Sequence, residues 1–272
     1  DNKINLLAVY RLFPRFLYCL FVVLLYYFFS EYTENKLELI WFLYISAEIV
    51  MLLYVFFKVN PSFKNLRKNI NLIWSYNKSY GLNVYLGTLF GVGCAQLTGV
   101  LISYFSNDNS GVGYYSIAIT ITLPLSFIPN VISTTHYKDF SVATRIPRRL
   151  FIITILLSVA ALIMLWFLVG PFIRIFYGNQ FAPVISLTMI VSIGVALYGL
   201  ADFFNRFLGS HGRGKELRNS SIIVGLSLLV CNFILVPLFG EKGAAYTKVI
   251  TGIVYVISIY WFYRKELTKT RS

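Results

Sequence analysis

The sequence predicts an all-α integral membrane protein with eight transmembrane helices. The chain is 57% hydrophobic and 18% aromatic, and only 13% of its residues are charged, whereas soluble domains carry about 25% charged residues. Several apolar runs reach the roughly 18 residues that a helix needs to span a bilayer. Short segments rich in Lys and Arg separate many of these runs, as is usual for loops outside the membrane.

The N-terminal part predicts two spans and then a helix that lies on the membrane surface. The spans cover residues 12–30 and 39–57. Asn60 and Pro61 have the residue types preferred at the N-cap and the first position of a helix. In the segment after them, apolar residues recur at helical spacing and basic residues lie away from them, which is typical of an interfacial amphipathic helix.

Residues 82–136 predict a helical hairpin, with apolar runs on both sides of a polar turn at 106–113. Small residues recur in the first helix at a spacing of four, at Gly87, Gly91, Ala95 and Gly99. Such a ridge lets helices approach closely in a bilayer, where the hydrophobic effect does not drive helices together. We therefore expect this helix to lie within a bundle.

The second helix of the hairpin carries a polar arc. At about 100° per residue, one side of the helix holds Ser116, Thr120, Asn130 and Thr134. The opposite side holds Ile121, Leu125, Ile128 and Ile132. This pattern predicts lipid on the apolar side and a polar cavity on the other. Pro124 and Pro129 favour a kink in the run, and the alternative is that hydroxyl groups and prolines are simply common in membrane helices.

Four more spans follow, over residues 150–169, 184–208, 220–238 and 244–262. Gly170 and Pro171 are expected to end the first of them, because proline cannot donate a backbone hydrogen bond. A basic tail, residues 264–272, ends the chain.

The net charge of +13 reflects membrane topology. Of the 24 Lys and Arg residues, all but four lie on the side that holds both termini. The four exceptions are Lys36, Arg174, Lys242 and Lys248. Short loops rich in Lys and Arg stay in the cytoplasm, so both termini are predicted to be cytoplasmic. We expect anionic membrane lipids as the counter-charge, and no nucleic acid partner.

Two stretches resemble Wzx-type polysaccharide and O-antigen repeat-unit flippases, which are members of the multidrug/oligosaccharidyl-lipid/polysaccharide (MOP) exporter superfamily. GVGYYSIAITITLPLSFIPNVISTT is similar to the family's eighth-helix region. The later stretch, from FYGNQFAP to GAAYTKVI, has the family's Y-G-x-x-F-x-P start, G-R-x-K loop and P-x-x-G-x-x-G-A-A turn. The order and spacing of these motifs carry the resemblance, since each motif alone is loose.

The resemblance implies twelve helices in two bundles that form a V around a central cavity. Residues 1–58 would be the last two helices of the first bundle, 59–81 a cytoplasmic surface helix and linker, 82–263 the second six-helix bundle, and 264–272 a cytoplasmic tail. Four earlier helices would then precede Asp1, which has no initiator Met before it.

The resemblance also implies a function. Such a flippase moves undecaprenyl-pyrophosphate-linked oligosaccharides across the bacterial inner membrane by alternating access, with proton or sodium coupling as one driving force. Its partners would be the lipid-linked oligosaccharide and other membrane proteins of polysaccharide assembly.

Charged residues inside the spans are the main site candidates, because an ionised side chain at the bilayer centre costs about 2.5–3.5 kcal/mol on insertion scales. Glu48 lies at the middle of its span. It is either a carboxyl group that couples proton movement to transport or a neutral group hydrogen-bonded to a neighbouring helix.

The other candidates lie in the second bundle. Asp202 and Arg206 have the i, i+4 spacing of an intrahelical ion pair, and Arg206 in a cavity would bind a pyrophosphate. Arg174 and Lys248 are interpreted first as anchors at the outer interface, and alternatively as cationic contacts for the lipid carrier. Gln96, like Asn130, is expected to hydrogen-bond between helices.

Two rival functions remain open. One is a drug or lipid II exporter of the same superfamily. The other is a membrane enzyme, such as a polysaccharide polymerase or acyltransferase, which would need a nucleophile and a base near its substrate. The short outer connections offer neither, and the cysteines show no metal-ligand spacing. We therefore expect no enzyme activity, no catalytic residues and no metal or cofactor.

Overall fold

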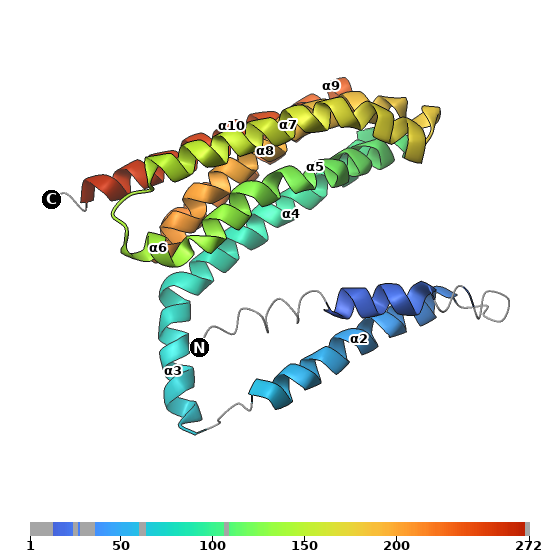
Figure 1. Cartoon of the computed structure of the whole chain (residues 1–272). Helices are drawn as coiled ribbons and strands as arrows, with labels where there is room; N and C mark the ends of the chain where they lie inside the picture. Colours follow the sequence, from blue (N-terminus) through green and yellow to red (C-terminus); the bar gives the residue numbers. More distant parts are fainter. Residues whose placement is uncertain (1–12, 24–26, 28–35, 60–63, 106–108, 270–272) are drawn as a thin grey trace. The chain divides into compact units, whose positions relative to one another are not determined.

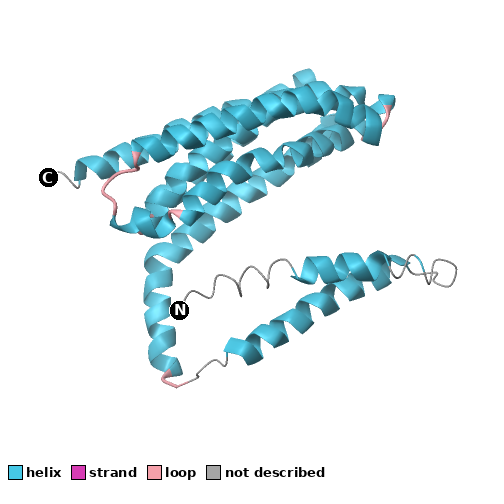
Figure 2. Cartoon of the chain, viewed as in Figure 1, coloured by secondary structure: helices cyan, strands magenta, loops and turns pink. Residues whose placement is uncertain are grey.

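The computed structural model describes residues 13–23, 27, 36–59, 64–105 and 109–269. Every regular element within these ranges is helical (Figure 2). Seven helical stretches there are long and apolar enough to cross a membrane. The chain is thus an all-α integral membrane protein, as predicted. The first predicted span, residues 12–30, contains the shorter apolar helix Phe13–Val23, and of its other residues only Tyr27 is described.

The first of two compact units is Asp1–Ile70. Its described helices are Phe13–Val23 and α2 (Lys36–Val59). The rings of Tyr18 and Tyr44 meet edge to face, with 5.4 Å between their centroids, so these two helices pack together. Aromatic pairs of this geometry contribute about 0.5–1.5 kcal/mol beyond their buried area.

An exposed helix lies in the predicted segment, but it begins at Leu66, after a turn in which Asn65 has a φ of +59°, rather than at residue 61. It comprises α3 (Leu66–Tyr76), in which no residue is buried, and the π-helical turn η1 (Asn77–Gly81), and it continues directly into α4 (Leu82–Phe105). The two compact units divide inside α3, between Ile70 and Asn71. The predicted cap at residues 60 and 61 lies outside the described residues.

The second unit, Asn71–Ser272, is a helical bundle (Figure 1). After α4 it contains α5 (Ser110–Thr135), α6 (Tyr137–Val142), α7 (Arg148–Phe176), η2 (Asn179–Phe181), α8 (Ala182–Ser210), α9 (Gly214–Phe239) and α10 (Glu241–Lys269). Helix α8 has the most extensive contacts, with α5, α10 and α7, and α9 packs against α4 and α10. Helix α8 therefore connects α5 and α7 with α10 inside the bundle.

The prediction that Gly170 and Pro171 end a helix is wrong. Helix α7 continues through both residues to Phe176. A proline removes one backbone hydrogen bond, which a membrane helix tolerates when its neighbours support it. The helix instead ends before Gly178, whose φ of +84° lies in the region that favours glycine.

The predicted basic tail is also largely helical. Helix α10 runs without interruption to Lys269, while residues 270–272 lie outside the described residues. Tyr263 and Glu266 on this extension are buried, and contacts with neighbouring segments stabilise it beyond the apolar span. Sequence hydropathy does not register such contacts.

The apolar side of α5 faces the bundle, which reverses the prediction. Leu125 is buried, and Ile121 and Ile132 pack against the buried clusters formed with α8. Ser116, Thr120 and Thr134, on the opposite side, are exposed on the second unit. Three residues of the polar arc therefore lie on the outer surface of this unit, whereas the fourth, Asn130, is partly buried. The error arose because apolar side chains are equally suited to lipid and to a helix partner.

Candidate functional site

Helices α8 and α10 approach each other most closely at two glycines. A Cβ atom placed on Gly194 would lie 2.7 Å from the carbonyl oxygen of Lys248, and one on Gly252 would lie 3.0 Å from the carbonyl oxygen of Gly194. Only glycine permits such an approach of two backbones. As a result, the side chains one or two turns from this contact meet between the helices.

Next to this contact, an open cavity of about 410 Å³ lies between α4, α8, α9 and α10. Thr88 and Ser221 line it, and the polar side chains of α8 and α10 in its wall are Tyr198, Asp202, Asn205, Lys248 and Tyr255. Cavities of about 300–1,000 Å³ with a few convergent polar groups are typical of ligand sites. A lysine and an aspartate inside a membrane-spanning bundle add a functional signal, because such groups are costly there.

A chain of hydrogen bonds orients the carboxylate of Asp202. The Asn205 amide donates to the Tyr255 hydroxyl at 2.8 Å, and that hydroxyl donates to Oδ1 of Asp202, also at 2.8 Å. The side chain of Asn130 on α5 also interacts with Asp202, and its Oδ1 atom is buried with no hydrogen-bond partner. The side chain of Asp202 on α8 is therefore held in place by Tyr255 on α10 and Asn130 on α5.

The ammonium group of Lys248 lies over the ring of Tyr198, with 3.9 Å between Nζ and the ring centroid. The negative face of an aromatic ring attracts a cation, by about 2 kcal/mol or more where water is excluded. Lys248 is also close enough to Asp202 for their charges to interact, although they form no direct ion pair. The cavity thus contains a cation that a negatively charged ligand can approach without first breaking a salt bridge.

Two interpretations of the charged candidates require correction. Asp202 and Arg206 do not form the predicted ion pair; among the described residues, Asp202 instead accepts its hydrogen bond from Tyr255. Asp202 faces α10, whereas Arg206 is exposed. Lys248 is not an anchor at the outer interface, because α10 begins at Glu241 and places it about two turns inside the helix, facing α8.

None of the remaining candidates in the second unit lines this cavity. Gln96 and Arg174 are exposed, on α4 and α7 respectively. Glu48 is partly buried on α2 in the first unit. Ser116, Thr120 and Thr134 lie on the outer surface of α5, where Thr120 donates a hydrogen bond to the backbone of Ser116. The structure therefore brings together Asp202, Lys248 and Asn130, with Arg206 close enough to interact electrostatically with Asp202.

Three side chains of the site, Tyr198, Asn205 and Tyr255, were not among the residues predicted from the sequence. A signal for them was present. Tyr198, Asp202 and Asn205 are spaced by four and three residues on α8, and Tyr255 follows Lys248 by seven residues on α10. Each set lies on one helical face. Because each tyrosine combines an apolar ring with one polar group, neither stood out among 20 tyrosines in an apolar chain.

The small-residue ridge of α4 has two roles. At Gly87 it packs tightly on α9, where an added Cβ atom would lie 2.8 Å from Cα of Arg218. Gly87, Gly91 and Ala95 also line the cavity, and a Cβ atom on Gly91 would still lie within van der Waals distance of Ser221 on α9. The prediction of close packing is therefore confirmed at Gly87, and the small side chains of the ridge also leave room for the cavity.

Comparisons with known proteins give two distant similarities. The chain is 21% identical over 282 residues to an uncharacterized membrane protein of Methanocaldococcus jannaschii, covering 98% of this chain and 54% of that protein. It is 24% identical over 121 residues to the capsular polysaccharide biosynthesis protein CapF of Staphylococcus aureus, covering 44% of this chain and 31% of that protein. The matches thus cover about half of the first relative's length and about a third of the second's.

No protein-family model matches the chain, and no solved structure matches it. The apolar helices and the similarity to a membrane protein lead to the same conclusion. The chain is a multi-pass, all-α integral membrane protein with a distant similarity to a protein of capsular polysaccharide biosynthesis.

Proposed function

We propose that the chain is part of a flippase that moves a lipid-linked oligosaccharide across the bacterial inner membrane by alternating access. The cavity between α4, α8, α9 and α10 carries this proposal, because it places Lys248 and Asp202 inside a membrane-spanning bundle. Intramembrane charges that line a cavity mark substrate or ion pathways. The similarity to a capsular polysaccharide protein gives the proposal its substrate class.

The chemistry of such a substrate suits the site. An undecaprenyl-pyrophosphate oligosaccharide combines an anionic diphosphate with many hydroxyl groups. Lys248 provides a cation, and Asn205 and the two tyrosines provide neutral hydrogen-bonding groups. In this mechanism the polar headgroup occupies the interior while the prenyl chain stays in lipid, and no covalent bond is made or broken.

Transport of a purified substrate tests the proposal. The complete protein, reconstituted in vesicles with a fluorescent undecaprenyl-pyrophosphate oligosaccharide, should transfer that lipid between leaflets faster than protein-free vesicles do. The recovered substrate should be chemically unchanged. Transfer of lipid II or of a cationic drug in its place would favour the rival exporters, and an elongated or acylated sugar would favour the enzyme.

Membrane orientation gives a second test. We propose that the ends of α8 and α10 face the cytoplasm, with the α9–α10 connection outside. Lys242→Cys and Lys215→Cys place one thiol at each end of the second unit, and both positions are exposed. In intact spheroplasts, an impermeant maleimide should label the first and spare the second until the cells are lysed. Labelling in the opposite order would refute this orientation.

A further inference from the structure

A second cavity lies at the opposite end of the second unit from the α9–α10 connection. It has a volume of about 630 Å³ and opens where α7 begins and α10 ends. Three arginines line it, Arg145 and Arg148 from the start of α7 and the segment before it, and Arg264 from α10. Tyr260, Tyr263 and Thr268 add hydroxyl groups to its wall. We call it the arginine pocket.

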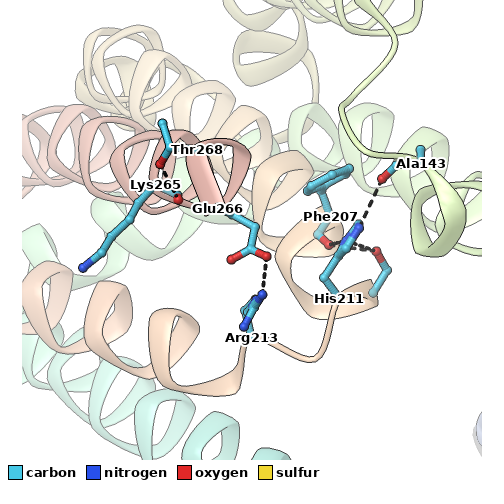
Figure 3. Close-up of polar contacts among 8 residues, drawn as sticks. Ala143, Phe207, His211, Arg213, Lys265, Glu266 and Thr268 are labelled. Atoms are coloured by element: carbon cyan, nitrogen blue, oxygen red, sulfur yellow. Dashed lines mark hydrogen bonds and ion pairs between the residues drawn. The ribbon is translucent and has the colours of Figure 1, made fainter. Parts of the chain in front are cut away.

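The three arginines have no carboxylate partner among the described residues. The ion pairs there join His136 to Asp139 and Arg213 to Glu266. Glu266 is the acidic residue closest in sequence to Arg264, and Figure 3 shows its carboxylate directed at Arg213. The nearby negative charge is therefore already paired, and the pocket keeps its three positive charges.

The N-terminus of α7 adds to the positive potential. Helix α7 follows Pro147, which provides no side-chain cap. The first N–H groups of a helix have no partner within the helix, and its dipole places partial positive charge there. Arg148 occupies the first position of this 29-residue helix. The arginine side chains and the backbone N–H groups therefore attract the same kind of ligand, an anion.

The walls of the pocket are held in place before any ligand binds. The backbone N–H of Ile146 donates to the hydroxyl of Tyr263 at 3.1 Å, which joins the segment before α7 to α10. Nε2 of His211 lies 3.1 Å from the carbonyl oxygen of Ala143, which joins the same segment to the end of α8 (Figure 3). A preformed site loses less entropy on binding than one that must be ordered.

We infer that the arginine pocket binds a phosphate group. Guanidinium groups bind phosphate oxygens bidentately, and basic pockets between helices at the cytoplasmic surface are suited to lipid headgroups. The phosphate belongs either to an anionic lipid or to a soluble phosphate. This site is separate from the cavity around Lys248, so the inference does not depend on the proposed transport.

Native mass spectrometry of the full chain in detergent tests the inference, with phosphatidylglycerol as the anionic probe and phosphatidylcholine as the zwitterionic reference. Arg145→Gln, Arg148→Gln and Arg264→Gln are combined in one variant. Because each basic residue contributes about fivefold to attraction by an anionic surface, the triple variant should bind phosphatidylglycerol roughly a hundredfold more weakly. Arg264→Gln alone should weaken binding of phosphatidylglycerol about fivefold. This single variant provides the test if the triple variant does not fold.

A matched control removes the same charge from the same end of the unit. Lys78, Lys138 and Lys215 are exposed and do not line the pocket, so their combined change to Gln should leave binding nearly unchanged. An equal loss in both triple variants, or equal wild-type binding of the two lipids, would overturn the inference. Displacement of phosphatidylglycerol by inorganic phosphate would identify a soluble ligand, and resistance to displacement would identify a lipid-borne phosphate.

Discussion

Replacing Lys248 by methionine should reduce transfer of the lipid-linked oligosaccharide by at least about tenfold. Methionine keeps an unbranched apolar side chain in the cavity but removes the cation that lies over Tyr198. A hydrogen bond to a charged group contributes about 1.5–3 kcal/mol, and about 1.4 kcal/mol corresponds to a factor of ten. The measurement is the initial rate of transfer in vesicles that contain equal amounts of the complete protein.

Lys242→Met is the matched control, because Lys242 is exposed on the same helix and does not line the cavity. Its transfer rate should equal that of the wild type. Lys248→Arg keeps the charge and should retain most of the activity. If Lys248→Met transports at the wild-type rate while remaining folded, the cavity is not the path of the phosphate and the proposed role of Lys248 fails.

Replacing Gly194 by leucine should have the largest effect on stability. Its Cβ atom alone would lie 2.7 Å from the carbonyl oxygen and 2.8 Å from the carbonyl carbon of Lys248, and neither backbone atom can move without displacing α10. Overpacking of a well-packed interior costs about 1–3 kcal/mol. We expect a clearly lower melting temperature in detergent, with Gly194→Ala intermediate between the wild type and leucine.

Gly93→Leu provides the comparison. An added Cβ atom at Gly93 on α4 meets nothing within 4 Å, so this variant should melt close to the wild type. Comparison of Gly194→Leu with Gly93→Leu separates the effect of steric contact from the effect of placing a leucine at a glycine position of a membrane helix. Equal melting of the wild type and Gly194→Leu would show that α8 and α10 do not approach as closely as the structure indicates.

Several features of the fold could be predicted because they depend on local composition. Apolar length identifies the spanning helices, since each must satisfy its backbone hydrogen bonds within itself in a bilayer. The helical conformation of Leu66–Tyr76 could be predicted from its periodicity, although not the residue at which the helix begins. The ends of α7 and α10 could not, because the passage of a helix through Pro171 and the extension to Lys269 depend on support from neighbouring segments.

The candidate site shows the same division. Lys248 and Asp202 could be singled out by charge alone, since any ionised group in an apolar run is exceptional. Their interpretations failed because spacing along one helix favoured Arg206 as the partner of Asp202, whereas Tyr255 from another helix forms the bond. No pattern within a single helix shows which face its neighbours cover.

By itself the sequence determined the class of this protein, its spanning segments and its rare intramembrane charges, because each depends on the transfer of side chains from water to lipid. Only the tertiary structure decided that Gly194 and Gly252 bring α8 and α10 into contact, and that Lys248 therefore meets Tyr198 beside Asp202. Association of helices in a bilayer depends on the fit between their surfaces, and that fit exists only once the partner helix is in place.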